Sequence, residues 1–126
     1  MMEESTASWE LPRDLTAGAA ARRHVSDFLS AADGDDLRDA CELVASELAV
    51  NAVRHGLPPA TMTLRRDGNG VLVEVTNRVG ATLPKVGSFD TESDHGRGLA
   101  IAARLAEHLD WDESDGRIRV RAQVSG

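Results

Sequence analysis

The chain has little cysteine, little positive charge and no long apolar run, and each absence excludes a class of protein. Its 126 residues include one cysteine, Cys41, so an intramolecular disulfide cannot form. No stretch approaches the ~18–20 apolar residues that a transmembrane helix requires. The first residues, Met1 to Glu4, are acidic and lack the basic-then-apolar pattern of a secretory signal peptide. These features predict a cytoplasmic protein without a membrane segment.

Negative charge exceeds positive charge along the chain. There are 21 Asp and Glu residues against 14 Lys and Arg residues, which gives a net charge of −7. Proteins that bind nucleic acids in general carry clustered positive charge, so direct nucleic-acid binding is not expected. An acidic surface instead suits a protein partner with basic patches. The apolar fraction of 41% fits one globular domain with its own core.

Apolar periodicity and turn residues predict an α+β fold. Residues 1–8 are polar and are expected to be disordered, and residues 9–126 are expected to form one domain. The last strand alternates apolar with polar residues, which is typical of a sheet with one solvated face, so its arginines are interpreted as solvent-exposed rather than as a site. The expected architecture is a two-layer sandwich of three helices on one face of a mostly antiparallel, mixed sheet. The expected elements are a strand at 9–11, helices at about 16–32, 35–55 and 98–108, and hairpins at 61–76 and 109–124.

A row of polar residues on the second expected helix is the most informative feature. Glu47, Asn51 and His55 are spaced four apart, so a helix brings them to one side, next to the apolar stripe that includes Val44 and Leu48. A carboxylate and an amide at the border of a core need polar partners, and a magnesium–phosphate group would provide them. A simple surface helix that ends in a glycine cap would also explain either residue taken alone.

Two further segments suggest phosphate binding. Residues 77–97 have no periodicity, and a loop of this length inside a compact domain is usually functional or mobile. Gly96-Arg97-Gly98 then opens the third expected helix, where free backbone N–H groups and the helix dipole favour an anion. A Gly-x-Gly before a helix is weak evidence by itself. Its position after a Glu-x-x-x-Asn helix and a strand is more specific.

These motifs resemble a known family. From about residue 9 to 124 the chain is similar to the anti-sigma factor serine/threonine kinases of the GHKL ATPase superfamily, of the small actinobacterial type. The segment from Glu47 to His55 resembles the N box, and Gly96-Arg97-Gly98-Leu99-Ala100 resembles the second glycine box. The segment from Val73 to Asn77 occupies the place of the first glycine box.

The resemblance implies ATP and Mg²⁺ as cofactors and assigns roles to individual residues. Glu47 would be the general base that activates the attacking hydroxyl, and Asn51 would be a Mg²⁺ ligand through its hard amide oxygen. Arg54 and His55 would border the phosphates. The backbone of Gly96, Arg97, Gly98 and Leu99 would hold the triphosphate, and residues 82–95 would form a lid.

One position departs from the family pattern. The first glycine box normally begins with an aspartate that accepts a hydrogen bond from the adenine amino group, and here that residue is Asn77. The usual pair of glycines is also missing, with Gly80 the nearest one. An asparagine keeps an acceptor oxygen but loses the charge, so adenine recognition is expected to be weaker by ~1–2 kcal/mol.

The favoured hypothesis is an anti-sigma factor that binds a sigma factor and uses ATP to phosphorylate a serine of an anti-anti-sigma (STAS) protein. The resemblance implies a homodimer that pairs through the region from Trp9 to Phe28. The first alternative is a degenerate regulatory binding module on the same fold that needs no nucleotide, as Asn77 suggests. The second alternative, the ATPase module of a histidine kinase, is disfavoured because no dimerisation helix or phospho-accepting histidine box precedes residue 9.

Overall fold

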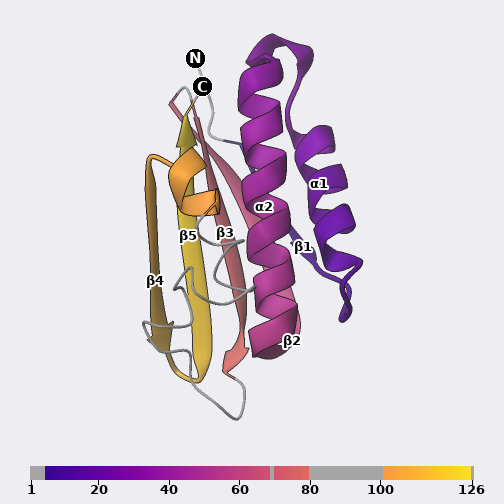
Figure 1. The fold of residues 1–126 in the computed structure, drawn as a ribbon, viewed down its shortest axis with the longest axis vertical. Helices are drawn as coiled ribbons and strands as arrows, with labels where there is room; N and C mark the ends of the chain where they lie inside the picture. The colour runs from indigo at the N-terminus through magenta and orange to yellow at the C-terminus, as the bar shows by residue number, and fades with distance from the viewer. Residues whose placement is uncertain (1–4, 69, 80–100, 126) are drawn as a thin grey trace.

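The protein folds as a layer of helices on one face of a five-stranded sheet (Figure 1). The computed structural model describes residues 5–68, 70–79 and 101–125. The sheet has the strand order β1-β2-β3-β5-β4, and all its described pairings are antiparallel. Residues 101–105 are also helical. The elements are β1 (Thr6–Glu10), α1 (Ala17–Phe28), the 3-10 helix η1 (Ala31–Asp33), α2 (Asp35–His55), β2 (Gly56–Asp67), β3 (Gly70–Val79), β4 (His108–Ser114) and β5 (Arg117–Ser125).

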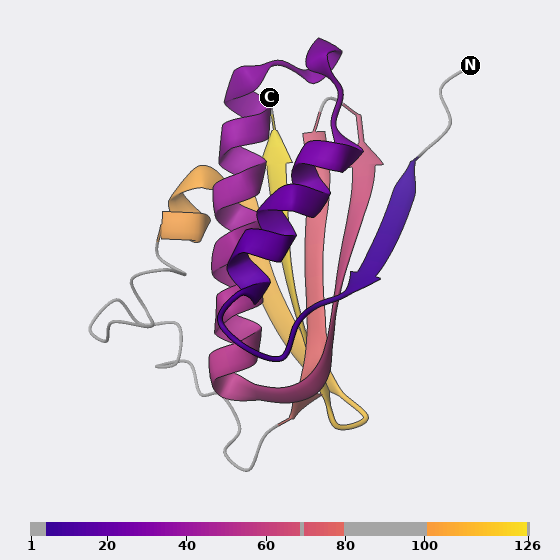
Figure 2. The ribbon, with the colours of Figure 1, turned by 90° about the vertical axis from the view of Figure 1, so that its right-hand side faces the viewer.

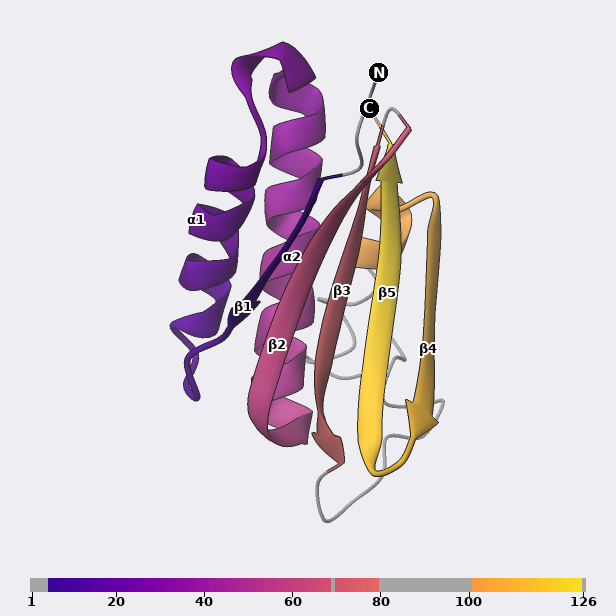
Figure 3. The same cartoon turned by 180° about the vertical axis from the view of Figure 1, so that it is seen from behind.

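The side view shows that all the helical segments lie against the same face of the sheet (Figure 2). The opposite face has no helix over it in the described part of the chain (Figure 3). This arrangement confirms the α+β sandwich expected from the sequence. Within the described residues, no helix is long and apolar enough to cross a membrane.

The core lies between α2 and the middle strands. On α2, Val44 and Leu48 are fully buried, and they face a sheet surface built from every second residue of its strands. The predicted alternation in β5 is confirmed, because Ile118, Val120, Ala122 and Val124 are buried while the residues between them are exposed or half-buried. The alternation in this strand therefore sets which of its side chains face the helices and which face solvent.

The predicted boundary between a disordered N-terminus and the domain, at residue 9, was wrong. Residues 1–8 were expected to be disordered, but β1 begins at Thr6 and pairs with β2 along its whole length. The hydroxyls of Ser8 and Thr63 also hydrogen-bond across this ladder at 2.8 Å. A polar segment can join a sheet edge through its backbone groups, which side-chain hydropathy does not reveal.

The third expected helix was predicted to reach about His108, and this end was also wrong. His108 is the first residue of β4, and the N–H of Glu107 donates to the carbonyl of Gln123 in β5 at 2.6 Å. Pairing with a strand far along the chain therefore ends the helical segment earlier than its local apolar pattern indicates. The start of that expected helix, at Gly98, lies outside the described residues.

An ion pair links η1, which lies between α1 and α2 in the chain, to the sheet. The guanidinium of Arg66 in β2 donates to both carboxylate oxygens of Asp33 in η1, at 2.6 and 2.8 Å. These charge-assisted bonds hold the pKa of Asp33 well below its usual range. The two-pronged contact therefore links the start of α2 to β2 with a defined geometry.

The single cysteine does not have the surroundings of a reactive thiol. Cys41 on α2 is fully buried, and this burial raises the pKa of its thiol to about 12. A thiol with such a pKa stays protonated at neutral pH and is a poor nucleophile. Cys41 therefore serves as an apolar residue of the core.

Candidate functional site

The polar row predicted on the second helix lies on α2 as expected. Glu47, Asn51 and His55 are all half-buried, whereas Leu48 and Ala52 beside them are buried. Arg54 lies on the exposed side of the same turn as His55. The row therefore follows the border between the core and the solvent, which is where a ligand can reach polar side chains held by a rigid helix.

The side chains of Glu47 and Asn51 do not hydrogen-bond to each other or to any other residue in the described ranges 5–68, 70–79 and 101–125. Half-buried carboxylates and amides normally find partners, because desolvation without a hydrogen bond is costly. The described part of the fold therefore leaves both side chains available for a ligand.

Asn77, predicted from the sequence to contact adenine, lies near the end of β3. The residue is 5% exposed and belongs to the face of the sheet that the helices cover. Its amide nitrogen donates to the carbonyl oxygen of Arg78 at 2.7 Å. This bond fixes the orientation of the amide and leaves the side-chain oxygen as a hydrogen-bond acceptor.

Gly56 brings the end of α2 directly against Asn77. A Cβ added at residue 56 would overlap the side-chain amide of Asn77 and lie 3.0 Å from the carbonyl oxygen of Ala52. The helix ends at His55, as predicted, but Gly56 does not act as a left-handed cap, because its φ is −123° and its ψ is −178°. The glycine is needed here for close packing, a role that the sequence did not reveal.

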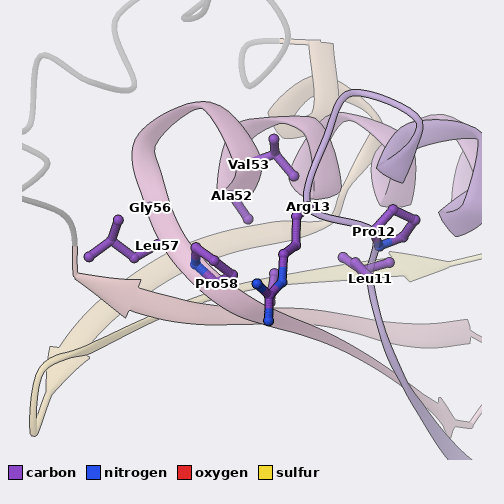
Figure 4. Close-up of a pocket in the computed structure, with 9 residues that line it drawn as sticks. Leu11, Pro12, Arg13, Ala52, Val53, Gly56, Leu57 and Pro58 are labelled. Atoms are coloured by element: carbon purple, nitrogen blue, oxygen red, sulfur yellow. The ribbon is translucent and has the colours of Figure 1, made fainter.

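A small, mostly apolar cavity also lies at this helix end (Figure 4). It is lined by residues that include Leu11, Val53 and Leu57, and Arg13 extends across it. Its volume of about 20 Å³ is enough for one water molecule and far too small for a nucleotide. We therefore do not assign the ligand to this cavity.

Several predicted site residues cannot be placed. Gly80, Gly96, Arg97, Gly98 and Leu99, and the expected lid at 82–95, lie outside the described residues. The predicted roles of these residues stay predictions.

The residues that are described fit the group that the sequence suggests. Mg²⁺ in nucleotide sites usually has few protein ligands and keeps water and phosphate oxygens in its coordination shell. The described residues contain no cluster of three His, Cys, Asp or Glu side chains that could hold a metal by itself. The amide of Asn51 can supply one oxygen ligand, and the oxygen of Asn77 can accept from an exocyclic amino group.

Comparison with known proteins agrees with the fold. The fold is similar to the crystal structure of the RsbU and RsbW domains of Rv1364c from Mycobacterium tuberculosis, with a TM-score of 0.70 and 17% sequence identity. The match covers 96% of this chain but only 32% of that one, so the chain spans about a third of its solved relative. No curated protein matches the chain in sequence. Residues 11–124 match the family of histidine kinase-like ATPase domains, and the chain belongs to this family.

Proposed function

We propose that this protein is an anti-sigma factor with ATP-dependent serine/threonine kinase activity. The observation that carries the proposal is the pair Glu47 and Asn51, half-buried on one side of α2 and without hydrogen bonds to the described residues. The family supports ATP as the ligand, and the similarity to a structure that contains an RsbW domain supports the anti-sigma interpretation. The partners in the proposal are a sigma factor and a STAS protein that carries the acceptor serine.

Each described residue has a distinct part in this proposal. Asn51 would ligate Mg²⁺, and Asn77 would accept a hydrogen bond from the adenine amino group. ATP would supply the phosphoryl group, and Mg²⁺ would screen the charge of its phosphates. The carboxylate of Glu47 would take the proton from the incoming serine hydroxyl. The new phosphate on the STAS protein would place about two negative charges at its interface with an acidic kinase and favour release.

Titration with ATP and Mg²⁺ tests the nucleotide site directly. We expect calorimetry to show binding by the wild-type protein, and Asn77→Asp to bind ATP about tenfold more tightly because a carboxylate is a stronger acceptor. The same substitution should lower the stability of the nucleotide-free protein. An aspartate cannot donate to the carbonyl of Arg78, and its charge would be buried.

Two results would contradict this part of the proposal. Absence of heat at millimolar ATP would favour the alternative, a binding module that needs no nucleotide. Unchanged ATP affinity in Asn77→Asp, with the expected loss of stability, would show that Asn77 lies away from the adenine. Asn69→Asp, at a residue that follows β2 and precedes β3 in the sequence, makes the same chemical change as a control and should alter neither measurement.

We also propose that the protein forms a homodimer through β1 and α1. β1 is an edge strand of the sheet, so one side of its backbone has no neighbouring strand in the described fold. The rings of Trp9 in β1 and His24 in α1 stack with centroids 4.4 Å apart and an angle of 9° between their planes. This contact joins β1 and α1. Light scattering at tens of micromolar should give twice the mass of the 13.5 kDa chain, and a mass of one chain would contradict the proposal.

A further inference from the structure

The face of the sheet without helices is toward the viewer in Figure 3, and the ladder between β2 and β3 in this sheet is irregular. Leu57 pairs with Arg78 and Thr61 pairs with Thr76, so β2 advances four residues (57 to 61) while β3 advances two (76 to 78). The extra residues of β2 include Pro59, which has no N–H group for the ladder. A cavity of about 240 Å³ lies beside this bulge, between residues of β2, β3 and β5.

Three arginines line this cavity, and two of them oppose each other directly. Arg78 on β3 is the ladder partner of Arg117 on β5. Side chains in such positions start about 5 Å apart, and like charges there destabilise the pair. The third, Arg119, forms an ion pair with Glu74 at 3.0 Å, and both of these residues also line the cavity.

Outside the cavity, this face carries Arg121, which has acidic partners, and Arg65, which has none among the described residues. On β5, Arg121 contacts Asp110 at 2.9 Å and Asp112 at 2.8 Å, both on β4. By contrast, neither Arg78 nor Arg117 has an acidic partner within residues 5–68, 70–79 and 101–125. Among the described residues, two of the three arginines of this face without an acidic partner therefore lie together at the cavity, on a protein whose net charge is −7.

We propose that this cavity is a second anion site, which binds the phosphate group of a phosphate monoester. Three arginines and one glutamate give the lining a net charge of +2. A phosphate monoester carries about −1.5 to −2 charges at neutral pH and so matches this lining. Guanidinium groups bind phosphate oxygens in a bidentate manner, and the hydroxyls of Thr61 and Thr76 add two further donors. An anion there would also relieve the repulsion between Arg78 and Arg117.

The cavity borders the proposed nucleotide site, because Asn77 also lines it, but the charged side chains of its lining lie on the other face of the sheet. Consecutive residues of a strand point to opposite faces, so the side chain of Asn77 belongs to the helix-covered face and that of Arg78 to the open face. The side chains that would bind the two ligands therefore belong to opposite faces of the sheet. The inference does not depend on the proposed kinase activity, since the arginines and threonines on which it rests are side chains of the open face.

Calorimetry on the full, nucleotide-free chain tests the proposal, with inorganic phosphate and free phosphoserine as probes and chloride to keep the ionic strength constant. We expect wild type to bind both, and R78Q/R117Q to bind each at least about tenfold more weakly. R65Q removes an exposed arginine from β2 outside the cavity lining, so it should bind like wild type. Circular dichroism establishes that each variant is folded.

A variant with the opposite expected effect keeps the test decisive. E74Q removes the negative charge from the lining and releases Arg119 from its ion pair, so it should bind phosphate several-fold more tightly. Equal phosphate affinities of wild type, R78Q/R117Q and E74Q would overturn the proposal. Failure of the wild-type protein to bind phosphoserine would overturn it as well. Asn51→Ala should leave phosphate binding unchanged, and loss of binding in that variant would show that the probe occupies the nucleotide site instead.

Discussion

Replacement of Glu47 by glutamine is expected to slow phosphotransfer by about 10²–10⁴-fold, the contribution typical of a general base. Glutamine keeps the size of the side chain and its hydrogen-bonding oxygen but cannot take a proton at neutral pH. Because Glu47 makes no side-chain hydrogen bond to the described residues, the substitution removes no such contact from the fold. ATP binding should therefore remain close to that of wild type.

Asn51→Ala should give a different result, because it removes a proposed metal ligand. We expect it to lose both Mg²⁺-dependent ATP binding and phosphotransfer. The contrast between the two variants is informative, since Glu47 and Asn51 lie one turn apart on the same side of α2 and have similar burial. A general disturbance of the helix would affect binding in both variants equally.

The measurement combines calorimetry with transfer of labelled phosphate to a STAS protein. Glu42→Gln is the matched control, because Glu42 is also a half-buried glutamate of α2 but lies outside the polar row. This variant should behave like wild type. Full phosphotransfer by Glu47→Gln would refute the assignment of the base, and unchanged ATP binding by Asn51→Ala would refute the assignment of the metal ligand.

Elements with a strong local pattern were predicted well from the sequence. The bounds of α2 followed from its apolar stripe and from the flanking turn and glycine-proline segments, and both hairpins followed from Gly-containing turns between alternating residues. The polar row was found for the same reason, because a spacing of four residues becomes one side of any helix that contains it.

Features that depend on distant partners were not predicted. Thr6 belongs to β1 because its backbone pairs with β2, and His108 belongs to β4 because its backbone pairs with β5. Likewise, the alternation of β5 placed its arginines on the solvated face, but only the register of the sheet shows that Arg78 opposes Arg117. Periodicity identifies the face of a strand, whereas pairing requires knowledge of which residues become neighbours.

At Gly56, the effect of a substitution depends both on the local backbone conformation and on a contact with a residue distant in the sequence. A glycine after a helix suggests a left-handed cap, and in that case alanine would be strained by its backbone conformation. The observed φ of −123° is accessible to any residue, and by that criterion alone alanine would stabilise the protein by about 0.4–1 kcal/mol. The contact with Asn77 predicts the opposite sign, because the added methyl group has no space.

Gly56→Ala is therefore expected to lower the free energy of unfolding by about 1–3 kcal/mol, as is typical of overpacking in a core. The methyl group must displace either Asn77 or the last turn of α2, which carries His55. Either movement disturbs the proposed adenine contact, so ATP affinity should fall as well. Urea unfolding measures the first effect, and calorimetry with ATP and Mg²⁺ measures the second.

A double-mutant cycle with Asn77→Ala identifies the cause. Asn77→Ala alone removes the donor to the carbonyl of Arg78 and should also destabilise the protein. In the double variant the methyl group added at residue 56 can occupy space that the amide has vacated, so the combined loss should be smaller than the sum by at least about 1 kcal/mol. Additive losses would show that the clash lies elsewhere, and a Gly56→Ala protein as stable as wild type would contradict the close approach of the helix end to β3.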